Sequence, residues 1–495
     1  MSLSVGCLVE HLDFGPGKII EVLGSKAVVD FFGDTIDCEA SELMVKKKQG
    51  PRVQNGIGAS RDKISFRRAF EAVNLGVVPP DTSCLIEMSI SGDKILEEVS
   101  DSLASAPEMG LCKVVFGNYG TGKSHYLHLV SVIARQAGWV VSYLEFDPKA
   151  VDPARPHLVY REIMARLRFP VREDGSQANS FHDFIKEIRS NWQDVRDLPL
   201  LKKSPWFKYG LETLLFYPHN EDQDYMNGCD WLAGQSVPIT GPGSIRNLAR
   251  GTTNIKPMTI PNMPKVRDTA EIYVFHLAVV NEICRALGYK GLLIILDEAE
   301  HVRGYNVLRK SRANHFFELL ARTAHTPLKT SDNMAPGENF GFQIPEYWQS
   351  GPHFALFVGL TEGNTFQDSS LSLRDACVFL HEKQDMITLQ PPTSEQYGDW
   401  CLKLLDHFFS YYPDKTSLIA TESARQEVAA VCKDEFSQHN GNSLVMRSWV
   451  KLACLIPSML MARKCDSVDN ITTIFRKAVN ELSGGYFPWE YSRND

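Results

Sequence analysis

The stretch GNYGTGKS, Gly117–Ser124, decides the fold class of this chain. It places three glycines within eight residues, directly after the apolar run Val114-Val115-Phe116. Glycine in the interior of a strand or helix costs stability, so such a cluster indicates a backbone with a special task. The spacing G-x-x-x-x-G-K-S is that of a phosphate-binding loop. An apolar strand is predicted before it and a helix-spaced apolar pattern follows Lys123, which is the context the motif requires.

The residue types of this loop suit a chain of phosphates. Glycines let several backbone N–H groups converge, because no Cβ blocks the approach. A helix that begins at Lys123 directs its dipole towards the anion. We therefore expect Lys123 to reach the β- and γ-phosphates of ATP and the Ser124 hydroxyl to bind Mg²⁺. The expected nucleotide-binding residues are Gly117, Asn118, Tyr119, Gly120, Thr121, Gly122, Lys123, Ser124 and His125.

A second apolar strand, 291–296, ends in acid, in the stretch GLLIILDEAEHV. Asp297 follows the strand directly, where it could hold the water shell of Mg²⁺. Glu298, the next residue, could polarise the attacking water as a catalytic base. An adjacent Asp-Glu pair distinguishes hydrolysing ATPases of the additional-strand class from GTPases and kinases. A further strand predicted at 139–146, between the loop and Asp297, supports this interpretation.

Three further polar residues are candidates for the catalytic site. Thr361 ends the strand predicted at 354–360, where it either senses the γ-phosphate or merely terminates the strand. Arg374 either completes the site of a neighbouring subunit or is a surface charge. Arg447 follows Asn-Gly-Asn at 440–442 and could reach the nucleotide from a lid helix. An arginine supplied by a neighbour would make ATP favour self-association, which light scattering with and without ATP would report.

The chain from about residue 70 alternates strands and helices, which implies an α/β fold with a parallel sheet covered by helices. We expect an ATPase domain over 69–392 and a helical lid over 393–495, which opens with a capping-box pattern at 393–396. Residues 195–265 are rich in Pro, Gly, Asn and Trp, and residues 325–352 lack periodicity, so both segments are expected to be insertions without regular structure. The strands of the sheet are predicted at 112–116, 139–146, 291–296, 354–360 and 386–389.

The N-terminal residues 1–45 alternate apolar and polar positions over short runs separated by turn signals, which predicts a small β-barrel. Residues 46–68 hold eight basic residues against one acid, Asp62, together with several Gly and Pro. This segment is either a solvated linker or a contact for nucleic acid.

Composition places the chain among globular proteins. Its 495 residues suggest two to four domains, and 43% hydrophobic with 23% charged residues is typical of a soluble fold. The eleven cysteines are scattered without a C-x-x-C pair, which favours reduced thiols. No signal peptide and no apolar run of about 18 residues is present, so we expect a cytoplasmic protein without a membrane contact. No nuclease, methyltransferase or protease constellation is evident.

Five stretches together resemble the BrxD-like ATP-binding proteins of bacterial BREX-type anti-phage defence loci, a branch of the AAA+ ATPases close to the initiator clade. The resemblance covers roughly residues 60–460, and its most specific parts are the first stretch and the GYKGLL lead-in to the acidic strand. It implies that the loop residues bind nucleotide and that Asp297 and Glu298 serve metal and water. The stretches are RRAFEAVNLGVVPPD (67–81), VVFGNYGTGKSHYLHLV (114–130), VSYLEFDPKAV (141–151), GYKGLLIILDEAEHV (288–302) and FVGLTEG (357–363).

The N-terminal pattern G-x-x-V-x-H-x-x-F-G-x-G, residues 6–17, is similar to the Tudor/SH3-like barrels of CarD-type regulators and of UvrD-type helicase C-termini. That resemblance implies a docking module for another protein, such as RNA polymerase or a helicase. With DNA and other defence proteins as partners, the chain would be an ATP-hydrolysing motor or loader. The alternative is a nucleotide-gated switch, whose turnover would be slow and indifferent to DNA.

Overall fold

The computed structural model describes most of the chain. The central sheet and the helices around it position the phosphate loop, which lies between a strand and a helix. The described residues are 8–11, 15–31, 34–45, 63–78, 85–86, 88–117, 120–147, 151–171, 177–217, 222–252, 255–264, 269–325, 353–361, 385–439 and 446–483.

The central sheet has six strands in the order β11-β6-β10-β9-β7-β8. All neighbouring pairs are parallel except β7 and β8. Strand β10 lies between β6, which leads into the phosphate loop, and β9, which ends in the acidic pair; this is an additional strand between the two. The predicted parallel α/β sheet is therefore confirmed. The strands are β6 (Leu111–Gly117), β7 (Val140–Glu145), β8 (Leu167–Arg168), β9 (Leu292–Asp297), β10 (Ala355–Thr361) and β11 (Met386–Thr388).

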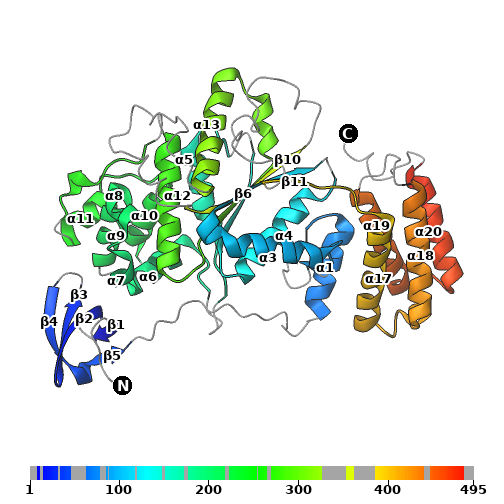
Figure 1. The fold of residues 1–495 in the computed structure, drawn as a ribbon, viewed down its shortest axis with the longest axis horizontal. Coiled ribbons are helices and arrows are strands. Elements are labelled where there is room, and N and C mark those ends of the chain that lie inside the picture. Colours follow the sequence, from blue (N-terminus) through cyan, green and yellow to red (C-terminus); the bar gives the residue numbers. More distant parts are fainter. Residues whose placement is uncertain are drawn as a thin grey trace.

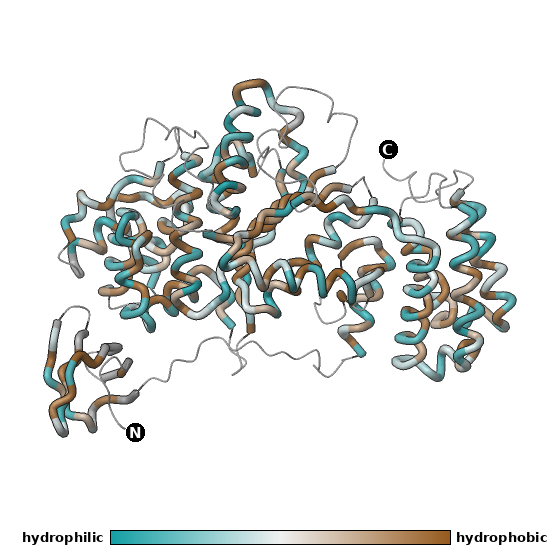
Figure 2. Tube along the Cα trace, viewed as in Figure 1, coloured by the Kyte–Doolittle hydropathy of each residue, from teal (hydrophilic) through white to brown (hydrophobic). Residues whose placement is uncertain are grey.

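Helices cover both faces of this sheet, which explains why every residue of β9 is buried. Alternate strand residues enter two separate apolar cores: Ile294 belongs to one and Ile295 to the other. Figure 1 shows the helices around the sheet, and Figure 2 shows hydrophobic segments concentrated along its strands. One face packs α3 (Gly92–Met109) and α4 (Lys123–Gln136), and the other packs α5 (Pro156–Ala165), α12 (Thr269–Ala286) and α13 (Val307–Ala324).

The expectation of an irregular insertion at 195–265 is wrong over its described residues, which are largely helical. The prolines that suggested loops start helices instead: Pro199 and Pro205 occupy the first turn, where no backbone N–H is required. Aromatic residues such as Phe207 and Trp231 are buried in the core beside α12. The helices of this region are α6 (Phe181–Ser190), α7 (Trp192–Val195), α8 (Pro199–Lys203), α9 (Pro205–Phe216), α10 (Gln223–Leu232), α11 (Ile245–Thr252) and η2 (Pro257–Thr259).

Helix α1 (Lys63–Leu75) shares its apolar core with the C-terminal helices and not with the central sheet. Its residues Phe66 and Phe70 both contact the ring of Phe408. A domain boundary at residue 69 therefore divides one helix, because the apolar face of α1 finds its partner far along the sequence. The C-terminal helices are α17 (Ser394–Tyr411), η5 (Ser417–Ile419), α18 (Glu422–His439), α19 (Met446–Met461) and α20 (Val468–Ser483), and α17 begins with the predicted capping box.

The N-terminal segment forms a five-stranded antiparallel sheet in the order β4-β3-β2-β1-β5. Its own small core contains Val9, Ile19 and Val29. Because β4 and β5 are the edges of this order, closure into an SH3-like barrel stays a prediction. Most of 46–68 and nearly all of 325–352 lie outside the described residues. The strands are β1 (Leu8–His11), β2 (Gly15–Leu23), β3 (Lys26–Phe31), β4 (Asp34–Glu39) and β5 (Leu43–Val45), with η1 (Ala40–Glu42) between the last two.

The short helix η3 (Ala299–Gly304) follows β9. Among the described helices, none is both long enough and apolar enough to cross a membrane.

Candidate nucleotide site

The phosphate loop connects β6 to α4 at the carboxyl edge of the sheet. Gly120 and Gly122 have φ of +81° and +93°, a region that residues with a Cβ rarely adopt. Gly122 is the residue before α4, so Lys123 and Ser124 begin the helix and its free N–H groups point towards the loop. This backbone suits an anion held by main-chain donors. Asn118 and Tyr119 lie outside the described residues.

The acidic pair follows β9 at the same edge of the sheet. Asp297 is 1% exposed; its Oδ2 accepts a hydrogen bond from the Tyr143 hydroxyl at 2.8 Å, and its Oδ1 accepts one from the Glu298 N–H at 2.9 Å. Burial, together with the charge of Asp297, raises the pKa of Tyr143 far above its usual value. Tyr143 therefore stays a neutral donor that fixes the orientation of the buried carboxylate.

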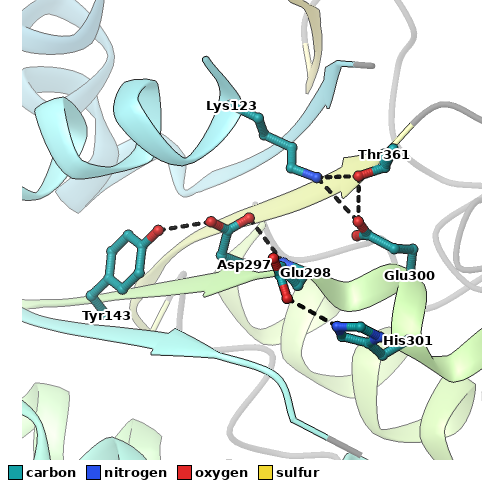
Figure 3. Close-up of polar contacts among 7 residues, drawn as sticks. All are labelled: Lys123, Tyr143, Asp297, Glu298, Glu300, His301 and Thr361. Atoms are coloured by element: carbon teal, nitrogen blue, oxygen red, sulfur yellow. Dashed lines mark hydrogen bonds and ion pairs between the residues drawn. The ribbon is translucent and has the colours of Figure 1, made fainter. Parts of the chain in front are cut away.

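Glu298 leaves the strand in a left-handed conformation, with φ of +57°. Such a backbone is strained for a residue other than glycine, and strain of this kind often accompanies functional sites. Its Oε2 lies 2.9 Å from Nε2 of His301, three residues along the chain (Figure 3). The carboxylate is partly exposed and lines the cavity described below, as a residue that activates water would require.

Lys123, Thr361 and Glu300 form a connected polar cluster across three elements (Figure 3). Lys123 Nζ donates to Thr361 Oγ1 at 2.5 Å and lies 3.3 Å from Glu300 Oε1. The Thr361 hydroxyl donates to the same Glu300 oxygen. Burial of Glu300 opposes its ionisation, but the hydrogen bond from Thr361 and the charge of Lys123 outweigh it and lower the pKa of Glu300.

Gly359 in β10 allows the acidic strand and the lysine to approach each other. A Cβ at this position would lie 2.7 Å from Asp297 Oδ1, 2.7 Å from Leu127 Cδ1 and 3.5 Å from Lys123 Cδ. Contacts below about 3 Å force neighbouring atoms to move, and here Asp297 and Leu127 are both buried.

Gly359→Ala is therefore expected to destabilise the fold by about 1–3 kcal/mol through overpacking and to reduce nucleotide binding by displacing Asp297. Thermal unfolding and nucleotide titration would measure both effects. Gly304→Ala is the matched control, because a Cβ at Gly304 meets no atom within 4 Å. Equal unfolding temperatures and nucleotide affinities for the two variants would contradict the close approach at Gly359.

A cavity of about 510 Å³ opens beside the phosphate loop. Its lining includes the polar side chains of Lys123, Ser124 and Glu298 and apolar residues from four parts of the chain. These are contributed by the segment after α1, by the start of α3, by the segment after β11 and by the lid helix α19. The volume and the mixture of polar and apolar lining residues suit a nucleotide. The apolar residues include Val77, Val78, Ile90, Ile95, Leu389, Met446 and Val450.

His125 lies at the start of α4 and lines this cavity, and its ring contacts Ser89 in the segment before α3. Its Nε2 lies 2.6 Å from the hydroxyl of Ser89, which in turn donates to the backbone oxygen of Leu85. Burial lowers the pKa of His125 to about 4, so the ring is neutral at pH 7. His125 thus ties the loop to the segment before α3 without adding a positive charge.

The structure brings most of the predicted site residues together at one edge of the sheet. Arg447 is the second residue of α19, is exposed and lines the cavity, whereas Arg374 lies outside the described residues. Sequence reasoning missed Tyr143, Gly359, Glu300 and His301. Two signals were available: the third acid in DEAE, and a glycine inside an apolar strand, which often marks a close approach. The predicted residues that line the cavity are Gly120, Thr121, Gly122, Lys123, Ser124, His125, Glu298, Thr361 and Arg447.

The donors present fit a magnesium ion that binds together with phosphates. The described residues contain no cluster of three or more His, Cys, Asp or Glu with metal-ligand geometry. Mg²⁺ in nucleotide sites needs none, since it binds one or two protein oxygens, phosphate oxygens and waters. Ser124 lines the cavity, and each oxygen of Asp297 accepts one hydrogen bond and keeps a lone pair. When bound, the ion would neutralise charge on the phosphate oxygens.

Comparison with known proteins agrees with this site. Residues 63–203, which include the phosphate loop, match the family described as BREX system ATP-binding protein BrxC/D. The match supports an ATP-binding P-loop protein that is similar to this family. No curated protein matches the chain.

One similar solved structure is a Walker-type ATPase of Pyrococcus abyssi. It is 12% identical, and the likeness covers 81% of this chain and 75% of that chain with a TM-score of 0.30. At this TM-score the two folds superpose only loosely.

Proposed function

We propose that this chain is a Mg²⁺-dependent ATPase of the AAA+ type that works with partner proteins in a BREX-type defence system. The observation that carries the proposal is the placement of β10 between β6 and β9. This order brings the loop lysine, the acidic pair and Thr361 to one edge of the sheet, beside a cavity of nucleotide size. The family match over 63–203 supports ATP as the nucleotide and the defence system as the setting.

In this proposal the chain's own residues divide the work. The loop N–H groups and Lys123 bind and orient the phosphates, and Thr361 contacts the terminal one. Glu298 takes a proton from the attacking water, since its carboxylate is accessible from the cavity. Asp297 is held by Tyr143 and serves with Ser124 as the candidate metal ligand. The apolar lining residues of the cavity receive the base.

The experiment is a titration of the full chain with ATP, with Mg²⁺ present or chelated, followed by measurement of released phosphate. Mg²⁺-dependent binding and turnover would support the proposal. Absence of ATP binding under both conditions would refute it. Binding with negligible turnover, unaffected by DNA, would favour the nucleotide-gated switch.

We also propose that DNA is a partner and that the basic segment 46–68 contributes to its affinity. The segment carries eight basic residues in a chain of net charge −8. Replacing Lys46, Lys47, Lys48 and Arg52 by Ala should weaken DNA binding and flatten its salt dependence, because fewer counterions are released. An unchanged slope of log affinity against log salt would contradict this role.

A further inference from the structure

Glu300 occupies a position that neither the loop motif nor the acidic pair explains. One of its oxygens, Oε1, lies against Lys123 Nζ and accepts the hydrogen bond of Thr361. Its other oxygen, Oε2, is buried and makes no hydrogen bond within the described part of the chain. A buried carboxylate with an unsatisfied oxygen is costly, so the site keeps an anion here at the expense of stability.

The two partners of Glu300 are the side chains that the proposed function assigns to the terminal phosphate of ATP. Lys123 begins α4, and Thr361 ends β10. A carboxylate oxygen between an ammonium group and a hydroxyl is therefore an anion in the place expected for a γ-phosphate oxygen (Figure 3). Its lowered pKa, caused by Thr361 and Lys123 against the opposing effect of burial, keeps it charged at pH 7.

From this geometry we propose that Glu300 competes with the γ-phosphate for Lys123 and Thr361 and thereby sets the discrimination between ATP and ADP. Two anions cannot share these two donors without strong repulsion in a partly buried site. Triphosphate binding must displace Glu300, whereas a diphosphate leaves its contact with Thr361 in place. After hydrolysis the carboxylate returns to both donors and repels the freed phosphate. The inference rests on the proposed function.

The test compares the affinities of a non-hydrolysable ATP analogue and of ADP, measured by calorimetry on the full chain with Mg²⁺. Glu300→Gln keeps the size of the side chain and removes its charge. Its affinity for the triphosphate should rise on the order of tenfold, while its affinity for ADP changes much less. Glu300→Asp keeps the charge but withdraws the carboxylate by one methylene, so it should shift the ratio in the same direction by a smaller factor.

The matched control is Glu318→Gln, since Glu318 lies on the neighbouring helix α13 and pairs with Arg322 at 3.0 Å. It should leave the ratio of the two affinities unchanged. A purely structural role for Glu300 would lower the unfolding temperature and weaken both nucleotides equally, which would overturn the inference. A role in holding the metal would weaken the triphosphate more than ADP, the opposite sign, and would overturn it as well.

The same experiment separates this inference from the proposed function. If the wild-type chain binds neither nucleotide, both fail. If the wild type binds both but Glu300→Gln leaves their affinity ratio unchanged, the nucleotide site stands and only the competition by Glu300 is wrong.

Discussion

Lys123→Ala is expected to lose ATP binding, with an affinity reduced about a hundredfold or more. The ammonium group is the cation nearest the expected β- and γ-phosphates, and charged donors of this kind are the strong contacts of a phosphate site. Isothermal titration of the variant and the wild type with ATP and Mg²⁺ would measure the loss. Equal affinities would remove the nucleotide site from this loop.

The substitution has a second effect that the structure makes clear. Lys123 is 8% exposed and neutralises Glu300, so its removal leaves a partly buried carboxylate without its cation. Such an orphaned charge should destabilise the fold by on the order of 2 kcal/mol. The double variant Lys123→Ala/Glu300→Ala is therefore the control: it should recover part of the lost unfolding temperature while ATP binding stays absent. Recovery of binding would show that misfolding, not the lost lysine, caused the first result.

Glu298→Gln is expected to bind ATP with nearly wild-type affinity and to lose turnover by about 10²–10⁴-fold. The amide has the size of the carboxylate but cannot accept a proton from water, and general-base catalysis contributes a factor of this order. Binding is measured by titration and turnover by phosphate release.

Glu318→Gln again serves as the control, because it lies outside the cavity and should retain turnover. Wild-type turnover in Glu298→Gln would assign the base to another group. Loss of ATP binding in this variant would instead place Glu298 among the binding residues.

The features that the sequence alone predicted depend on residues close together in the chain. The phosphate loop can be recognised in the sequence because its backbone needs glycine at fixed positions. In the structure Gly120 and Gly122 have the left-handed φ that only glycine adopts freely. The capping box at the start of α17 can also be recognised, because it involves residues within one turn. The side chains of Thr393 and Gln396 accept hydrogen bonds from each other's backbone N–H groups.

The prediction failed where one residue type is compatible with two kinds of local structure. The prolines of 195–265, in a segment also rich in Gly, Asn and Trp, suggested loops, because proline breaks helices from within. Pro199 and Pro205 stand instead at helix starts, where their rigid φ favours the first turn. Burial of residues such as Phe207 then gives these short helices the packing that makes them stable.

The sequence by itself determined the loop, the acidic strand and the strand–helix alternation, because each depends on neighbours only a few residues apart. The tertiary structure decided which other residues lie next to the loop and the acidic strand. The order of strands put β10 between β6 and β9 and so brought Thr361 to Lys123, 238 residues away along the chain. It also turned Glu300, an unremarked acid in DEAE, into the partner of both. Contacts across such separations depend on how whole elements pack, and no local pattern of residues records them.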